Sequence, residues 1–149
     1  MHTHELDDHK QMSSPTLCEF APYLSINDAQ SAVAFCTDVF DVAPHVLLNM
    51  PDGRVMHCEF RIGNGRFFLS EELPEHGGMP SPTRLGGTSV ATHLCVDDCA
   101  AMVESMKNNG SEVLMDPTDV FWGERFSRVG DPIGHEWGFT TRLHAMSPD

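Results

Sequence analysis

The sequence predicts an α+β fold made of two tandem βαβββ modules, and two observations lead to this prediction. Apolar residues first follow the order strand, helix and three strands between residue 20 and about residue 73. The same order then returns about 70 residues later, where Thr92–Asp98 (THLCVDD) aligns with Pro22–Asp28 (PYLSIND). A chain of 149 residues is long enough for one domain in which both halves share a core.

The first half opens with Pro22–Ile26, a short apolar and β-branched segment that is typical of a strand. Asn27–Asp28 can cap a helix, because the apolar residues that follow fall on one helical face. The remainder predicts three strands joined by two hairpin turns, in the order 45–50, Asp52–Gly53, 55–62, Asn64–Gly65 and 66–70.

The second half repeats these elements. After its first strand near Thr92, a helix is expected to end at Asn108–Gly110, where a glycine can take the left-handed conformation. Three more strands are expected over 111–115, 124–129 and 135–141. The segment between the halves is rich in Gly and Pro, so the sequence predicts a first module over about 20–73, a linker over about 74–88 and a second module over about 89–143.

Charge and composition exclude several classes of protein. Nine Lys and Arg against 22 Asp and Glu give a net charge of −13, which argues against nucleic acid and against an anionic membrane surface as partners. No apolar run is long enough to span a membrane. Residues 1–18 are polar, unlike a signal peptide, and are expected to be a disordered tail. The odd count of five cysteines suits reduced thiols in a cytoplasmic protein.

Three motifs resemble a known family: Val55–Gly63 (VMHCEFRIG), Asp119–Phe126 (DVFWGERF) and Asp131–Trp137 (DPIGHEW). With the duplicated βαβββ order, they resemble the PhnB-like branch of the vicinal oxygen chelate superfamily, which includes glyoxalase I, bleomycin-resistance proteins and extradiol dioxygenases. The resemblance implies a single domain over 19–145. It also implies a half-barrel of the glyoxalase and bleomycin-resistance type, with helices on the convex side and a cavity on the concave side.

Strand alternation sorts side chains between these two sides, because successive residues of a strand point to opposite faces. The helix side is expected to hold Leu24, Ile26, Met56, Cys58, Phe60, Ile62, Trp137 and Phe139. The other side is expected to carry Tyr23, Ser25, His57, Glu59, Arg61, Glu136, Gly138 and Thr140. Ala91, His93 and Cys95 should share one face of their strand.

Metal-using members of the superfamily place one His, Gln or Glu on the first and last strand of each module. The resemblance transfers those positions to Ala21, Phe68, Ala91 and Gly138. None of these side chains can bind a metal, so no metal or other cofactor is expected. A displaced site made of His57, Glu59 and His93 remains an alternative.

Other residues point to ligand binding. His57 lies near Glu59, which suits either a general base or a donor that orients an anionic ligand. Alternatively, His57 and His93 only form hydrogen bonds within the barrel. Trp122 could stack on a ligand and Arg125 could hold its carboxylate or phosphate, unless Trp122 fills the core and Arg125 pairs with an acid. The candidate catalytic residues are His57 and Glu59, and the candidate ligand-binding residues are Tyr23, Phe68, His93, Trp122 and Arg125.

Three functions remain open. The preferred hypothesis is a metal-free protein that binds a small aromatic or polar molecule, as bleomycin-resistance proteins do. The alternatives are an enzyme of lyase, isomerase or dioxygenase type, with a displaced metal or His57 as base, and an interaction protein whose cavity is filled by its own side chains. A methyltransferase is disfavoured, because no glycine-rich turn for a nucleotide cofactor is present. The resemblance and the open sheet edges predict a homodimer.

Overall fold

The structure is a computed structural model that describes residues 15–143. The disordered tail predicted over 1–18 therefore lies mostly outside the described residues, and residues 15–22 have no regular secondary structure. The first module holds β1 (Tyr23–Ile26), α2 (Ala29–Phe40), β2 (Val46–Asn49), β3 (Val55–Ile62) and β4 (Gly65–Glu71). The linker holds η1 (Pro74–His76) and α3 (Pro82–Leu85). The second module holds β5 (Ala91–Cys95), α4 (Cys99–Asn108), β6 (Glu112–Val120), β7 (Glu124–Gly130) and β8 (Glu136–Arg142).

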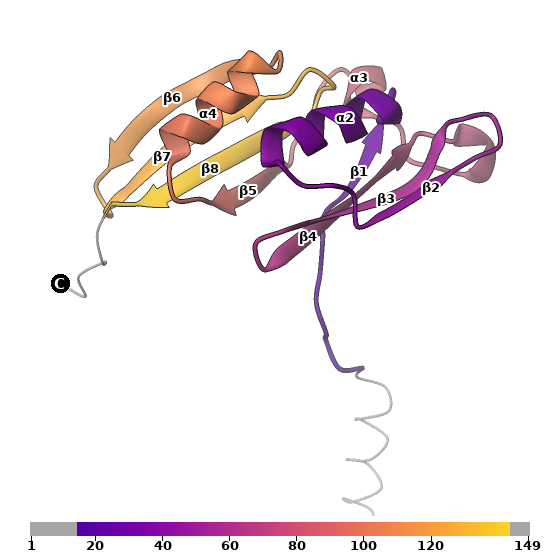
Figure 1. Cartoon of the computed structure of the whole chain (residues 1–149), viewed down its shortest axis with the longest axis horizontal. Coiled ribbons are helices and arrows are strands. Elements are labelled where there is room, and N and C mark those ends of the chain that lie inside the picture. Colours follow the sequence, from indigo (N-terminus) through magenta and orange to yellow (C-terminus); the bar gives the residue numbers. More distant parts are fainter. Residues whose placement is uncertain (1–14, 144–149) are drawn as a thin grey trace, which may run out of the picture.

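Each module forms a four-stranded sheet with the same topology, in the orders β1-β4-β3-β2 and β5-β8-β7-β6. The first strand of each module runs parallel to the last, and the other neighbours are antiparallel. Figure 1 shows α2 and α4 on the same side of the molecule, covering one side of the two sheets. The predicted α+β fold of two βαβββ modules is therefore confirmed. We call the sheet side away from these helices the open face.

Helix α2 begins at the predicted cap, and α4 ends at the predicted glycine. The Asp28 side chain caps α2 by accepting a hydrogen bond from the Ser31 backbone N–H, and Asp98 caps α4 by accepting from the Ala101 N–H. After α4, Gly110 has a φ of 94°, which a residue with a Cβ rarely adopts.

A shared aromatic core joins the modules on the helix side. Trp137 of β8 is 1% exposed, and its ring lies 5.3 Å from the Phe40 ring and 5.3 Å from the Phe67 ring. Both phenylalanines belong to the first module, so Trp137 is buried against residues of the other half of the chain. Helices α2 and α4 also contact one another. The two halves thus bury one continuous core.

The linker is more ordered than its composition suggests. The Glu72 carboxylate, 6% exposed, accepts hydrogen bonds from the Ser81 N–H and hydroxyl and from the Arg84 guanidinium. Ser81 in turn caps α3 by accepting from the Arg84 N–H. A Cβ at Gly78 would lie 1.9 Å from the Glu72 carbonyl oxygen, so only glycine fits there. These contacts fix the linker against the end of β4.

Two local expectations from the sequence are wrong. Met56 was expected under the helices, but it is 46% exposed and Val55 is buried in its place. The cause is a register shift where β2 pairs with β3, which interrupts the strict alternation at this point. The second hairpin turn of the first module uses Gly63–Asn64 rather than Asn64–Gly65, because Gly65 already pairs with Ile62 in the sheet.

Other findings concern the helices and the thiols. Within residues 15–143, no helix is long and apolar enough to cross a membrane. All five cysteines lie within the described range, where they form no disulfide. Burial raises the pKa of the Cys58 thiol to about 11, so this side chain stays protonated near neutral pH and behaves as a small apolar residue.

Candidate functional site

The open face of the first module carries a cluster of three rings from three strands. Tyr23 of β1 pairs across strands with Phe68 of β4, and His57 lies on β3. The Tyr23 hydroxyl is 2.8 Å from His57 Nδ1, within hydrogen-bond distance. The ring centroids are 5.5 Å apart for Tyr23–Phe68 and 5.3 Å apart for His57–Phe68. The structure thus brings three of the predicted site residues together as one aromatic surface.

Glu59 lies on the same face as His57, but its carboxylate interacts with arginines. Arg61 Nε is 2.7 Å from one carboxylate oxygen, and Arg66 Nη1 is 3.4 Å from the other. The Glu59 side chain is only 7% exposed, and these cations offset the cost of its burial. The guanidinium of Arg66 also lies 5.2 Å from the Phe68 ring centroid. Glu59 therefore positions two arginines beside the aromatic cluster.

The second module presents a histidine and an aromatic ring on its own open face. His93 of β5 stacks on Phe126 of β7 with ring centroids 5.8 Å apart. Gly138 of β8 is the cross-strand partner of His93, and a Cβ there would lie 2.9 Å from His93 Nδ1. The glycine at position 138 thus leaves the space that the imidazole ring occupies. Phe126 was not among the predicted site residues, although alternation along Glu124–Gly130 places it on this face.

The duplication relates the two clusters. The helix caps Asp28 and Asp98 are equivalent, and counting back equally from each reaches Tyr23 and His93. Their cross-strand partners, Phe68 and Gly138, are then equivalent as well. Following the sheet pairing outward makes His57 equivalent to Phe126 and Glu59 equivalent to Arg128. Each module therefore combines a histidine with an aromatic ring. The histidine lies on β3 in the first module, whereas in the second module it lies on β5, the equivalent of β1.

Trp122 and Arg125 lie at the far end of the second sheet. Trp122 is in the turn between β6 and β7, is 45% exposed, and lies edge-on to Phe121 with centroids 4.8 Å apart. Its indole N–H donates to Glu124. Arg125 points away from the Phe126 side and binds Asp119, with Nε 2.7 Å from one carboxylate oxygen. Arg125 thus pairs with an acidic side chain, which the sequence leaves open as the alternative to holding a ligand's carboxylate or phosphate.

The residues around the transferred metal positions do not suit a divalent ion. Their side chains end in methyl, phenyl or hydrogen, and so they offer no lone pair to a metal; the positions are Ala21, Phe68, Ala91 and Gly138. The cross-strand partners of Phe68 are Tyr23 and Glu59, and those of Gly138 are His93 and Arg128. Only Glu59 and His93 among these are common metal ligands, and the Glu59 carboxylate already pairs with Arg61 and Arg66. In the described part of the chain, no group of three His, Cys, Asp or Glu side chains is arranged to hold a metal.

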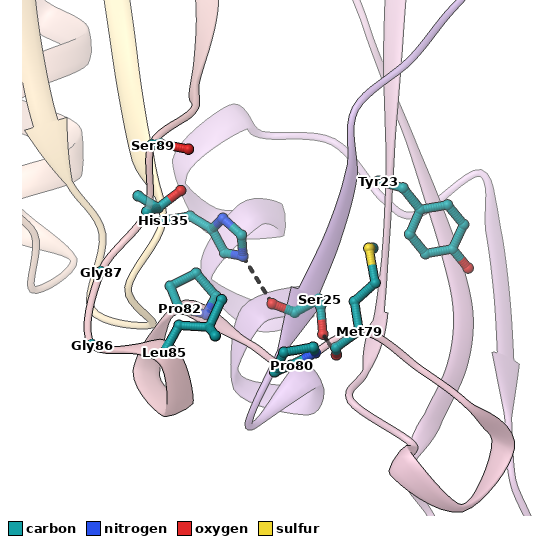
Figure 2. Close-up of a pocket in the computed structure, with 11 residues that line it drawn as sticks. Tyr23, Ser25, Met79, Pro80, Pro82, Leu85, Gly86, Gly87, Ser89 and His135 are labelled. Carbon is teal, nitrogen blue, oxygen red and sulfur yellow. Dashed lines mark hydrogen bonds between the residues drawn. The ribbon is translucent and has the colours of Figure 1, made fainter.

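Two pockets lie where the modules meet. The linker pocket, about 480 Å³, is lined by linker residues together with Tyr23, Ser25 and His135. In Figure 2, His135 Nε2 reaches the Ser25 carbonyl oxygen, 2.9 Å away, whereas the Tyr23 ring points away from His135. The Ser25 hydroxyl donates to the Met79 carbonyl. Since Ser25 and His135 already use these polar atoms in hydrogen bonds within the protein, the atoms are not free to bind a ligand in the linker pocket.

The second of these pockets, which we call the inter-module pocket, also measures about 480 Å³. It is lined by residues 20–22, by the start of β4 and by residues 90–94, which include Ala21, Ala91 and His93. Phe68 and Gly138 are not part of its lining. The four transferred metal positions are therefore divided between this pocket and the sheet surfaces.

Comparison with known proteins identifies the family. Residues 18–139 match the family described as the Glyoxalase/Bleomycin resistance protein/Dioxygenase superfamily. The chain belongs to this superfamily. The match spans both modules and confirms the relationship that the sequence motifs predict.

Relatives and solved structures agree with this assignment. An uncharacterized protein of Mycobacterium bovis is 34% identical over 131 residues, covering 87% of this chain and 86% of the relative. A Pseudomonas aeruginosa crystal structure has a TM-score of 0.67 at 21% identity, covering 85% of this chain and 98% of that one. A Bacillus cereus protein described as PhnB has a TM-score of 0.61 at 16% identity, covering 83% and 99%. At such low identities, the structural matches show a common fold.

Proposed function

We propose that this superfamily member binds a small aromatic molecule on its open face and needs no divalent metal to do so. The observation that carries the proposal is the Tyr23–His57–Phe68 cluster, in which a 2.8 Å contact with Tyr23 holds His57 beside two aromatic rings. A planar ligand can stack on these rings. His93 and Phe126 supply a second stacking surface in the other module.

The contact with Tyr23 also defines what His57 offers a ligand. When the phenol O–H donates to Nδ1, a neutral imidazole carries its proton on Nε2. His57 then presents a hydrogen-bond donor, which suits a ligand with an oxygen acceptor. An enzyme that uses His57 as a general base needs the opposite tautomer, with Nε2 free to accept a proton. The direction of the Tyr23–His57 hydrogen bond therefore decides whether Nε2 donates to a ligand or accepts a proton.

The proposal is tested with a matched pair of probes, 2-naphthol and naphthalene, in equilibrium dialysis against protein treated with EDTA. We expect 2-naphthol to bind more tightly than naphthalene, because only 2-naphthol has an oxygen that can accept from His57. His57→Ala and Phe68→Ala should each weaken 2-naphthol binding by about tenfold, equivalent to about 1.4 kcal/mol. Trp122→Ala, at the far hairpin, is the control and should leave binding unchanged.

The metal requirement is tested on the same protein. We expect elemental analysis to find no stoichiometric divalent ion, and EDTA to leave 2-naphthol binding intact. A stoichiometric ion that is lost in His93→Ala would contradict the proposal and would support an enzyme with a displaced metal. Binding that disappears with EDTA and returns with added Zn²⁺ or Ni²⁺ would have the same meaning.

We also propose that a second copy of the chain packs on the outer strands of the open faces, β2 and β6, beside the ligand-binding rings. Each face exposes large apolar side chains, such as Leu48 at 47% and Leu114 at 43%. Arg61 and Arg128 neutralise the carboxylates of Glu59 and Glu136 on these faces. In a chain whose net charge is −13, this pairing reduces the repulsion between two copies that meet here. Light scattering should give the mass of a dimer.

The double variant Leu48→Glu with Leu114→Glu should be monomeric, because it places unpaired charge in the proposed contact. Leu85→Glu is the control, since Leu85 lies on α3 and is already 68% exposed. A monomeric mass for the unaltered protein at micromolar concentration would contradict the dimer.

A further inference from the structure

A polar hollow of about 400 Å³ lies at the hairpin between β3 and β4. It is lined by the turn at Gly63–Gly65, by Phe20 and by three charged side chains, Glu19, Arg61 and Arg66. The two arginines are cross-strand partners, so their side chains leave the sheet next to one another on the same face. We call this hollow the arginine hollow.

The arginine hollow adjoins the Tyr23–His57–Phe68 cluster, because Arg66 belongs to both. Its guanidinium carbon lies 5.2 Å from the Phe68 ring centroid. The centroid of the His57 imidazole lies 5.3 Å from the same ring. These two distances limit how far apart the guanidinium and the imidazole can be. A two-ring aromatic molecule that lies over Phe68 can therefore reach both.

A carboxylate of the chain itself already occupies the arginine hollow. Glu19 forms an ion pair with Nη2 of Arg66. The Glu19 side chain is 56% exposed, and its segment has no regular secondary structure. An exposed ion pair on an irregular segment contributes little stability, so a carboxylate on a ligand that also stacks on the rings can replace it.

The two arginines keep nitrogen atoms and charge for such a carboxylate. Within residues 15–143, Arg61 donates only through Nε, to Glu59, whereas Arg125 and Arg128 each bind a carboxylate through two nitrogens. Both Nη atoms of Arg61 can therefore bind a further carboxylate. When Glu19 leaves, the two arginines face the Glu59 carboxylate alone. One positive charge then remains, which suits a monoanion.

We propose that the ligand of the open face is an aromatic monocarboxylate, an inference that rests on the function proposed above. Its rings stack on the Tyr23–His57–Phe68 cluster. Its carboxylate takes the place of Glu19 in the arginine hollow and accepts hydrogen bonds from Arg61 and Arg66. Glu19 is then an internal competitor, which pairs with Arg66 until the ligand binds.

The first test compares 6-hydroxy-2-naphthoate with its methyl ester in equilibrium dialysis against the full-length protein near neutral pH. The ester has the same rings and hydroxyl but no charge. We expect the acid to bind about tenfold more tightly, because charged groups form the stronger hydrogen bonds. Equal affinities, with 2-naphthol still bound, would overturn this inference alone. If 2-naphthol does not bind either, the proposed function fails with it.

The internal competitor is tested with Glu19→Gln. This variant should bind the acid about threefold more tightly and the ester as before, since it removes an exposed ion pair. Glu104→Gln is the control, because it removes the same charge from an exposed position on α4 and should change neither affinity. Unchanged or weaker binding of the acid to Glu19→Gln would overturn the proposal.

The contact with Arg61 is tested with Arg61→Gln, which should weaken binding of the acid about tenfold. Arg61 also pairs with Glu59, so the ester shows whether the open face is intact, and its affinity should stay the same. Arg125→Gln is the matched control, since Arg125 is paired with Asp119 at the far end of the second sheet. Equal losses for acid and ester in Arg61→Gln, or equal losses of the acid in both variants, would contradict the contact.

Discussion

Tyr23 and His57 hold one another on the open face of the first module, and this contact leads to a test at a single atom. Tyr23→Phe removes the hydroxyl 2.8 Å from Nδ1 but keeps the ring. The His57 tautomer should then shift away from protonation at Nε2 alone, and 2-naphthol should bind about fivefold more weakly, a loss of about 1 kcal/mol. Nitrogen NMR of the imidazole measures the tautomer. An unchanged tautomer would mean that Tyr23 does not orient His57.

Gly138 is the residue on which the position of His93 depends. Gly138→Ala would place a Cβ 2.9 Å from the imidazole Nδ1, so the ring must leave its stack on Phe126. We expect about tenfold weaker 2-naphthol binding with a fold that stays intact, because the imidazole can move toward solvent. Gly130→Ala is the matched control, since a Cβ there meets only the Leu114 side chain at 3.6 Å. Equal effects of the two variants would contradict this role.

The sequence predicts which face of a strand a site residue lies on, but it does not predict which residues of other strands contact it. Alternation alone places Tyr23 and His57 on one face, because the backbone fixes where successive side chains point. Arg66 and Phe126 were missed, since their importance lies in which strands pair and in which register. The space left by Gly138 for His93 is a distance between side chains, and no pattern along one strand contains it.

At the scale of the element, the linker is fixed by one buried carboxylate. Arg84 and the Ser81 hydroxyl and N–H lower the pKa of Glu72 to about 2, from an ordinary value of 4.5. A lowered pKa means that the folded state favours the charged form. The resulting stabilisation is present above pH 4.5 and is lost as the pH falls toward 2.

Glu72→Gln should therefore lower the Tm near neutral pH by roughly 3 °C, and the gap from the unaltered protein should close as the pH falls toward 2. Thermal unfolding followed by circular dichroism at several pH values measures this. Glu104→Gln, an exposed carboxylate on α4 with no ion pair within residues 15–143, should change the Tm little at any pH. A gap that persists at the lowest pH would show that the linker is held by other contacts.

The elements themselves were largely predictable, and the exceptions have local causes. Asp28, Asp98 and Gly110 mark the ends of the helices because capping and left-handed backbone depend on nearby residues. The exposure of Met56 was not predictable, since the register shift arises from pairing with a separate strand. Likewise, α3 is only Pro82–Leu85, and it is held by Glu72 rather than by an apolar pattern of its own.

At the scale of the whole molecule, Trp137 makes the two modules one unit of stability. Trp137→Ala should cost about 3–5 kcal/mol, because it leaves a cavity between Phe40 and Phe67 and removes the indole bond to Asp131. Urea unfolding should show one transition for the unaltered protein. Trp122→Ala, at an exposed hairpin, should cost less than about 1 kcal/mol. Two separate transitions in the unaltered protein would contradict a shared core.

Asp131 reinforces the same junction from inside the second module. Its carboxylate accepts from the backbone N–H groups of Ile133 and His135 and from the Trp137 indole. Burial raises the pKa of this carboxyl, and the three donors oppose that rise. This turn also orients the side chains of His135 and Trp137, which reach the other module.

The Trp137 indole, on which both modules pack, limits how the protein can move when a ligand enters. Because both modules pack on the same indole, they cannot separate about a hinge, and ligand binding does not require such a motion. Adjustment is left to single side chains and to the irregular segment around Phe20. Free and loaded forms should therefore have nearly superimposable backbones, and entry rates should be set by diffusion rather than by a rearrangement of the protein.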